Sequence, residues 1–175
     1  MNITLVMVQS INGKITRGED SNVPTWTSVE DTEHFHTMID HAPLIIMGRH
    51  TYEAAKSSIK HKDSTLRIVI TSSPTNYQSE EVPHALEFTD EKPEVLIDRL
   101  EKTGYSHGLL VGGASLNSAF LSAGLVDDIY LTVEPRIFGT GRPLVEDSNL
   151  DISLTLLESK KLNDKGTLLL HYKVS

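Results

Sequence analysis

Three short segments rich in glycine, hydroxyl groups or basic residues each follow an apolar run, and their residue types suit phosphate binding. The segments are Gly48-Arg49-His50-Thr51, Thr71-Ser72-Ser73 and Gly112-Gly113-Ala114-Ser115-Leu116. Glycine lets a ligand approach the backbone, small hydroxyl side chains donate hydrogen bonds, and a planar guanidinium suits a phosphate. If a helix starts in such a segment, its free N–H groups and its dipole also favour an anion. Each segment taken alone could equally be an ordinary surface turn.

The elements that would position these segments are strands and helices in alternation. Short apolar and β-branched runs predict strands at 3–8, 44–47, 66–70, 85–88, 108–111 and 128–133. Helices are expected from Ser28, from about Thr51, from Pro93 to Gly104, and after Gly113 through Ala123. Two more strands, at 152–157 and 167–174, flank the turn sequence 163–166 and predict an antiparallel hairpin.

This order of elements predicts an α/β fold. Its central sheet is expected to be mostly parallel, with helices on both faces and an antiparallel edge at the C-terminus. Ligands of such open sheets bind at the carboxyl ends of the strands. The three segments would then meet along one edge and hold a single extended ligand with several phosphates. A dinucleotide meets that description.

The composition restricts the classes of protein to which this chain can belong. Its 175 residues suggest one domain, residues 1–175, with enough length for a large core. A formal net charge of −8 argues against nucleic acid as a partner, because phosphate backbones attract the opposite charge. The lack of cysteine excludes disulfides, thiolate catalysis and zinc–sulfur sites. Since the chain shows neither a signal-peptide pattern nor an apolar run of about 18 residues, we expect a cytoplasmic protein without a membrane partner.

Two other features carry less information. The stretch 139–144 begins like a dinucleotide fingerprint, but Leu144 stands where the third glycine would be, so we interpret it as a glycine-rich loop. His34 and His36 would point to different faces of a helix, and no His-Glu-x-x-His spacing occurs in the chain. We therefore expect no metal site.

The same residues resemble a known family. The stretches Trp26–Phe35 and Pro43–Glu53 resemble dihydrofolate reductase, and three later stretches fit in the same order, namely Arg67–Ser73, Val111–Leu116 and Ile129–Thr132. Two others, Ser10–Ile15 and Leu125–Leu144, are closer to the reductase (C-terminal) domain family of riboflavin biosynthesis. The single motifs are moderate, but their order along the chain is specific.

The resemblance implies a dihydrofolate reductase-like fold that binds NADPH. It assigns Gly48–Thr51 to the phosphates, Thr71–Ser73 to the 2′-phosphate of the adenosine ribose, and Gly112–Leu116 to the pyrophosphate. Thr16 and Trp26 match positions that line the nicotinamide. The strand at 44–47 would thus end where it presents a helix start to the cofactor.

The resemblance also implies an NADPH-dependent oxidoreductase. Hydride would go to a C=N or C=O carbon of a small heterocyclic substrate, pterin-like or pyrimidine-like. Asp31 is the candidate catalytic residue, because its spacing from Trp26 and Phe35 is that of the family's carboxylate and burial would raise its pKa. Asp31 could instead be a first-turn acid that only interacts with the helix dipole. His34, one turn further, is a weaker candidate for the proton donor.

Departures from the family leave other functions open. Val111 stands where riboflavin reductases usually have Glu before the glycine pair, and Asn12 stands where they have Asp. An NADPH-binding module of the same fold without catalytic activity is therefore the alternative, and a structural protein that binds no nucleotide is a third possibility. The partners expected are a small-molecule substrate and a second copy, since the resemblance favours a homodimer that could form through the apolar strand at 167–174.

Overall fold

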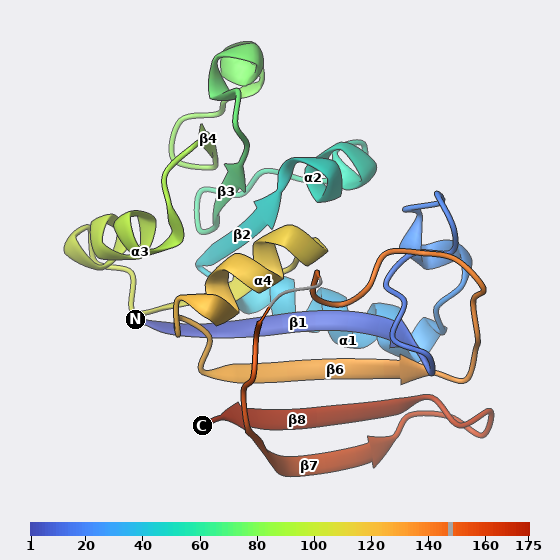
Figure 1. Cartoon of the computed structure of the whole chain (residues 1–175). Coiled ribbons are helices and arrows are strands. Elements are labelled where there is room, and N and C mark those ends of the chain that lie inside the picture. The colour runs from blue at the N-terminus through green and yellow to red at the C-terminus, as the bar shows by residue number, and fades with distance from the viewer. Residues whose placement is uncertain (147–148) are drawn as a thin grey trace.

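An eight-stranded sheet forms the centre of the protein (Figure 1). The computed structural model describes residues 1–146 and 149–175. The strands are β1 (Asn2–Ser10), β2 (Leu44–Gly48), β3 (Leu66–Ile70), β4 (Leu86–Thr89), β5 (His107–Leu110), β6 (Asp128–Glu134), β7 (Leu154–Lys161) and β8 (Leu168–Val174). The helices are α1 (Val29–His41), α2 (Arg49–Ala55), α3 (Pro93–Lys102) and α4 (Ala114–Ser122), with 3-10 helices η1 (Val23–Thr25) and η2 (Pro74–Glu80).

The strand order confirms the predicted fold class. The order is β4-β3-β2-β5-β1-β6-β8-β7, and the neighbours from β4 to β6 are all parallel. Strand β8 pairs antiparallel with both β6 and β7, which gives the expected C-terminal hairpin. No helix among the described residues is long and apolar enough to cross a membrane.

Both faces of the parallel part are covered by helices, because successive side chains of its strands point to opposite faces. Leu44 and Ile46 pack in the cluster formed with α3 and α4. Ile45 and Met47 pack in a second cluster, to which α1 contributes Phe35, Met38 and Ile39. The four apolar residues 44–47 therefore contribute to two hydrophobic clusters, one on each face of the sheet, and the end of β2 lies between these clusters.

Several element boundaries differ from the sequence prediction, and those of α2 and β7 have a clear physical reason. Helix α2 begins at Arg49, two residues before the expected start, because only Gly48 keeps an extended conformation before the chain turns into the helix. Strand β7 covers Leu154–Lys161 instead of 152–157. Its second half is polar and pairs with β8 through the backbone as far as Lys161 opposite Leu168, so hydrophobicity alone did not reveal it.

We expect the Gly108→Ala substitution to destabilise the protein by about 1–3 kcal/mol, because a Cβ there overfills a packed core. That Cβ would lie 2.8 Å from the Leu44 Cδ2 atom, at the point where β5 supports the start of β2. Urea denaturation measures the change in the free energy of unfolding. Gly139→Ala is the matched control, since nothing lies within 4 Å of its added Cβ. Equal stability of the two variants would contradict this packing.

Candidate functional site

The first and third predicted phosphate segments lie in contact. The Gly48 N–H donates a 2.7 Å hydrogen bond to the Gly112 carbonyl oxygen. A Cβ added at Gly48 would lie 3.5 Å from the Gly113 nitrogen, and one added at Gly113 would lie 3.7 Å from the Thr51 hydroxyl oxygen. The Gly112–Gly113 peptide bond is cis. At these three glycines, which we call the glycine cradle, the backbones of the two segments approach each other closely.

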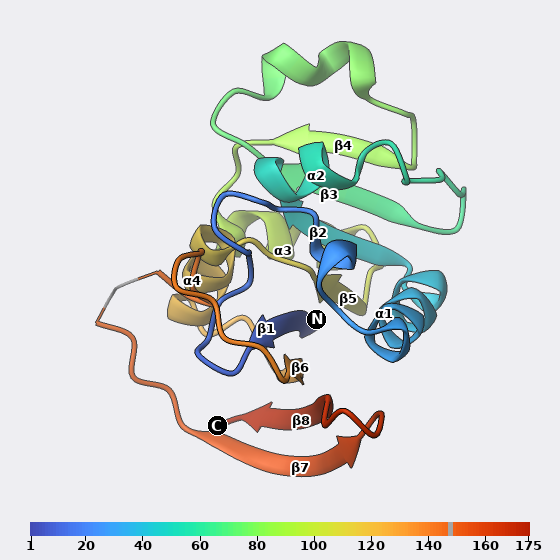
Figure 2. The same cartoon turned by 90° about the vertical axis from the view of Figure 1, so that its right-hand side faces the viewer.

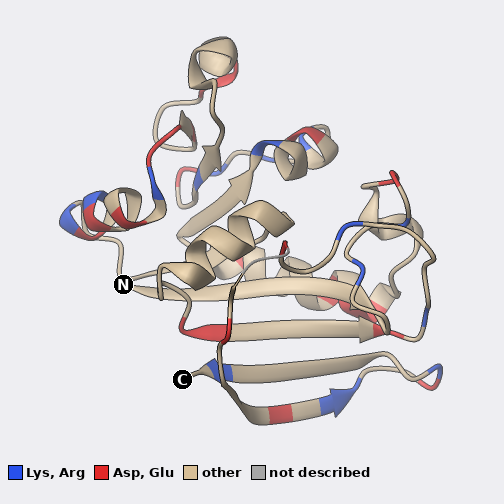
Figure 3. Ribbon diagram, viewed as in Figure 1, with Lys and Arg blue, Asp and Glu red and all other residues tan. Residues whose placement is uncertain are grey.

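Two helices begin at the glycine cradle with N–H groups that no side chain caps. Gly48 is the N-cap of α2 and Gly113 that of α4, and neither makes a side-chain capping hydrogen bond. Helix α4 carries no charged residue, whereas Lys and Arg occur on α2 and on loops at the same end of the sheet (Figure 3). Free backbone donors beside an open cradle fit the pyrophosphate of a dinucleotide.

The second predicted segment follows the neighbouring strand. Gly48 pairs with Ile70 in the parallel ladder of β2 and β3, so Thr71 leaves the sheet next to the glycine cradle. Thr71 is buried, and its hydroxyl oxygen accepts the Ser73 N–H at 3.3 Å. Ser72 and Ser73 are exposed. Thr71 therefore shapes the turn, and the two serines are the members of this segment that a ligand can reach.

Arg49 lies at the predicted place, but its guanidinium already has partners. Its Nη1 donates to both carboxylate oxygens of Glu53 at 3.1 Å, and its Nη2 lies 2.7 Å from Nε2 of His50. The Tyr77 hydroxyl donates to the same Glu53 carboxylate at 2.5 Å. Hydrogen bonding to Glu53 is the main cause that raises the pKa of Arg49. A phosphate at this position would have to share Arg49 with Glu53.

The first residues of α4 offer mainly their backbone. Ala114 and Leu116 are buried, so they pack the helix against the sheet. The Ser115 hydroxyl donates to the Glu146 carboxylate. One turn on, the buried Asn117 leaves its Oδ1 without a hydrogen-bond partner among the described residues. Of the predicted residues here, only Ser115 has an exposed side chain, and a carboxylate already holds it.

The loop between β1 and α1 carries the two residues predicted at the nicotinamide end. In Figure 2 this loop crosses the carboxyl edge of the sheet between α4 and α1. The Thr16 hydroxyl donates to the Gly18 carbonyl oxygen at 2.9 Å and accepts the Arg142 N–H at 2.8 Å, so it braces the loop. Trp26 is buried edge-on against Phe138, with ring centroids 5.2 Å apart. The Trp26 Nε1 is buried without a hydrogen-bond partner among the described residues.

Asp31 is buried in the first turn of α1, close to the end of β6. Ser28 caps this turn, because its hydroxyl oxygen accepts the Asp31 N–H at 3.2 Å, as the sequence pattern predicted. The Ser28 N–H itself donates to the Glu134 carboxylate at 2.6 Å. The side chains of Thr132 and Thr27 hydrogen-bond to the Asp31 carboxyl group. Asp31 is therefore largely buried among polar side chains.

Burial is the main cause that raises the pKa of Asp31 from 3.8 to about 6. Hydrogen bonding from Thr132 and Thr27 opposes this change, whereas the charge of Glu134 adds to it. A carboxyl group with such a pKa still holds a useful fraction of its proton near neutral pH and can donate it. The structure shows the burial expected of Asp31, while its catalytic role stays a prediction.

Sequence reasoning missed the residues that surround Asp31, above all Glu134. Thr132 and Glu134 are two residues apart on β6, so both side chains point to the same face of the sheet. Both are buried. An acidic residue at a position of a strand that should face the core is a sequence signal for a buried acid such as Glu134. This signal does not indicate which residue lies beside it.

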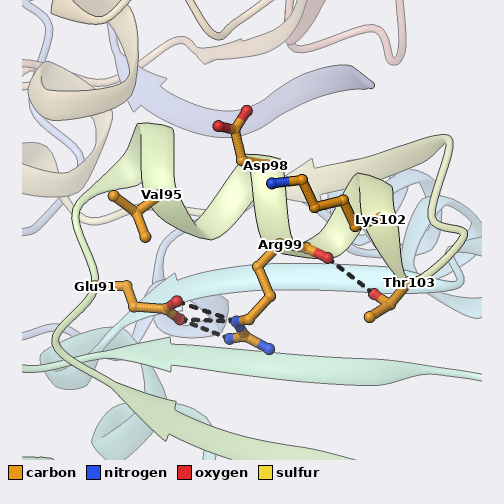
Figure 4. Close-up of a pocket in the computed structure, with 6 residues that line it drawn as sticks. All are labelled: Glu91, Val95, Asp98, Arg99, Lys102 and Thr103. Carbon is orange, nitrogen blue, oxygen red and sulfur yellow. Dashed lines mark hydrogen bonds and ion pairs between the residues drawn. The ribbon is translucent and has the colours of Figure 1, made fainter.

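A groove of about 460 Å³ lies on α3, away from the glycine cradle (Figure 4). It is lined by Glu91, Val95, Asp98, Arg99, Lys102 and Thr103. The Arg99 Nη2 donates to Glu91 at 2.7 Å and also bonds to Glu87. Because two carboxylates already hold its arginine, this groove suits a phosphate less well than the glycine cradle does.

The strand order, the helices on both faces and the hairpin define a protein of the dihydrofolate reductase-like class. The family model of the RibD C-terminal domain matches residues 1–168, so the chain belongs to the RibD C-terminal domain family. The curated protein YwjB of Bacillus subtilis (strain 168), described as uncharacterized, is 29% identical over 177 residues, which cover 96% of this chain and 95% of that protein.

Solved structures share the fold over the whole chain. A putative riboflavin biosynthesis protein from Shewanella sp. PV-4 superposes with a TM-score of 0.79 at 19% identity, covering 100% of this chain and 99% of that one. A diaminohydroxyphosphoribosylaminopyrimidine deaminase/5-amino-6-(5-phosphoribosylamino)uracil reductase from Thermotoga maritima superposes with a TM-score of 0.77 at 16% identity. That match covers 99% of this chain but 56% of the Thermotoga protein. At these identities the likeness concerns the fold.

Proposed function

We propose that this protein is an NADPH-dependent reductase that acts on a C=N or C=O group of a small pterin-like or pyrimidine-like heterocycle. The observation that carries the proposal is the buried Asp31, whose pKa is raised to about 6. Its neighbour Glu134 ends β6 opposite Ser10, the last residue of β1, and the glycine cradle follows β5 on the other side of β1. An acid near the end of β6 and an anion cradle after β5, with β1 between them, suit a reaction that needs both.

Family membership supports the same proposal. Among proteins of this fold, the Thermotoga relative is described by its name as a reductase of a pyrimidine. The departures at Val111 and Asn12 argue that the substrate of this chain is not contacted in the usual way. Its identity within the class of small heterocycles is therefore left to experiment.

Different residues along the carboxyl edge of the sheet would bind the phosphates and the nicotinamide of the cofactor. The glycine cradle and the exposed Ser72 and Ser73 would bind the phosphates, and Trp26 would wall off the nicotinamide end. Bound NADPH would supply a hydride to the carbon of the double bond and leave as NADP⁺. The nitrogen or oxygen of that bond then needs a proton. Asp31 would donate it and be reprotonated from water.

Titration with NADPH followed by single-turnover measurements tests this function. We expect saturable binding, and loss of NADPH absorbance with at least one member of a panel of pterins, pyrimidinones and simple carbonyl compounds. Binding without oxidation across the panel would favour the alternative, a cofactor-binding module of the same fold without catalysis. No binding at all would overturn both functions.

We further propose that the protein forms a homodimer through the β7–β8 hairpin. Strand β7 is an edge strand and exposes Leu154, Leu156 and Leu157, which are 43%, 51% and 55% accessible. Exposed leucines on an unpaired edge favour association with a second chain. Light scattering on a sizing column is expected to show a dimer that Leu156→Lys converts to a monomer. Val95→Lys, at an equally exposed position on α3, is the control, and a monomeric wild-type protein would contradict the proposal.

A further inference from the structure

We propose that Glu134 is a positioning residue for the proton donor. Its carboxylate ties the first turn of α1 to the sheet and favours the protonated form of the neighbouring Asp31 carboxyl group. The inference rests on the proposed reductase function, which it deepens, but its test can fail separately from that function.

Glu134 joins three parts of the chain that are far apart in sequence. One carboxylate oxygen, Oε1, accepts the Ser28 N–H at 2.6 Å, and the other, Oε2, accepts the Thr167 hydroxyl at 2.7 Å. Ser28 is the N-cap of α1, and its hydroxyl oxygen holds the Asp31 N–H. The carboxylate of Glu134 therefore fixes the turn on which Asp31 stands.

Glu134 is a buried acid whose two oxygens both act as hydrogen-bond acceptors, one from a backbone N–H and one from a hydroxyl group. The residue is 3% exposed. The ion pairs formed by the described residues do not include Glu134, so no cation neutralises it. Burial of a charge without a cation costs stability, which points to a use in function.

Among the groups around Asp31, Glu134 is the one whose charge raises the pKa of Asp31. Thr27, from the loop before α1, and Thr132, from β6, are neutral. On α1, Glu30 is exposed and held by Asn163, and His34 lies one turn further along. Two carboxyl groups that share a desolvated pocket do not both ionise easily. The charge of Glu134 therefore favours the protonated form of Asp31.

The test is a Glu134→Gln substitution read by NMR of labelled Asp and Glu carboxyl carbons in the protein without substrate. Asp31→Asn assigns the Asp31 signal. We expect the Asp31 titration midpoint of Glu134→Gln to fall by about 0.5–1 pH unit, because the like charge is removed. Glu134→Asp, which keeps the charge, should retain more of the wild-type midpoint. Glu33→Gln, which removes an exposed acid of the same helix, should leave the midpoint unchanged.

The wild-type protein provides a second measurement if Glu134→Gln does not fold. In that protein the Asp31 signal should titrate with a midpoint above the usual pKa of an aspartate. A wild-type midpoint in the usual range, or an unchanged Asp31 midpoint in a folded Glu134→Gln variant, would overturn the inference, whereas the reductase function is tested separately by NADPH oxidation. A shifted midpoint in a protein that never oxidises NADPH would support the coupling and refute the reductase.

Discussion

The Asp31→Asn variant is expected to oxidise NADPH about 10²- to 10⁴-fold more slowly than the wild-type protein in a single turnover. Asn keeps the size of the side chain and its contacts with Thr132 and Thr27, but it carries no proton that it can release at neutral pH. NADPH affinity should stay the same, because Asp31 belongs to the first turn of α1 and not to the glycine cradle. Stopped-flow absorbance gives the rate, and fluorescence titration gives the affinity.

Glu33→Gln is the matched control for this prediction. Glu33 lies on the same helix and is exposed, so its substitution should leave the rate within about twofold. If Asp31→Asn retains the wild-type rate, the proton comes from water or from another group such as His34. Asp31 would then be a buried acid without a role in the reaction.

The Asp31→Asn substitution should also make the protein more stable than wild type above about pH 6. The pKa of Asp31 is raised in the folded state, from 3.8 to about 6. The folded protein therefore binds this proton more tightly than the unfolded chain, and wild-type stability falls as pH rises between these two values. The loss is roughly 3 kcal/mol. Asn cannot ionise, so urea denaturation should show the variant more stable than wild type by up to that amount above pH 6. Below about pH 4 we expect no such advantage.

The Gly113→Val variant is expected to bind NADPH about 10- to 100-fold more weakly, which corresponds to roughly 1.4–2.7 kcal/mol. A side chain at this position enters the glycine cradle on the side of Thr51 and covers the first N–H groups of α4. The backbone of Gly113 has φ −84° and ψ −163°, which valine can adopt, so we expect the fold to be retained. Isothermal titration calorimetry measures the affinity.

Gly112→Ala distinguishes loss of the cradle from loss of the fold. Gly112 has φ +89°, and an added Cβ would lie 2.9 Å from the sulfur of Met7, so this variant should lose stability as well as affinity. Gly113→Val should lose affinity with little change in the midpoint of denaturation. Wild-type NADPH affinity in Gly113→Val would mean that the cofactor lies elsewhere.

Much of the architecture is local and therefore readable in the sequence. The run at 44–47 is apolar on both faces, as a strand covered on both sides requires, and the structure places helices on both faces. Ser28 followed by Asp31 predicted the start of α1 because an N-cap is a contact within one turn. The resemblance added the order of the site segments, and the parallel ladders bring them to one edge.

Other parts could not be predicted because they depend on contacts between distant residues. The length of β7 is decided by backbone pairing with β8, which side-chain polarity does not report. The contact of Tyr77 with Glu53, which is the partner of Arg49, and the engagement of Ser115 by Glu146 follow from where other segments come to lie. A residue type suited to a phosphate can thus be identified from sequence, whereas its free or occupied state cannot.

The sequence by itself determined the α/β order, the glycine cradle segments and the candidate acid, since these are properties of single residues and of their local spacing. Only the tertiary structure decided that Asp31 is buried and that Glu134 is its charged neighbour, 106 residues beyond the Ser28 that it holds. The physical reason is that desolvation and like-charge coupling act through space, over a few ångströms, between side chains that the chain order keeps far apart.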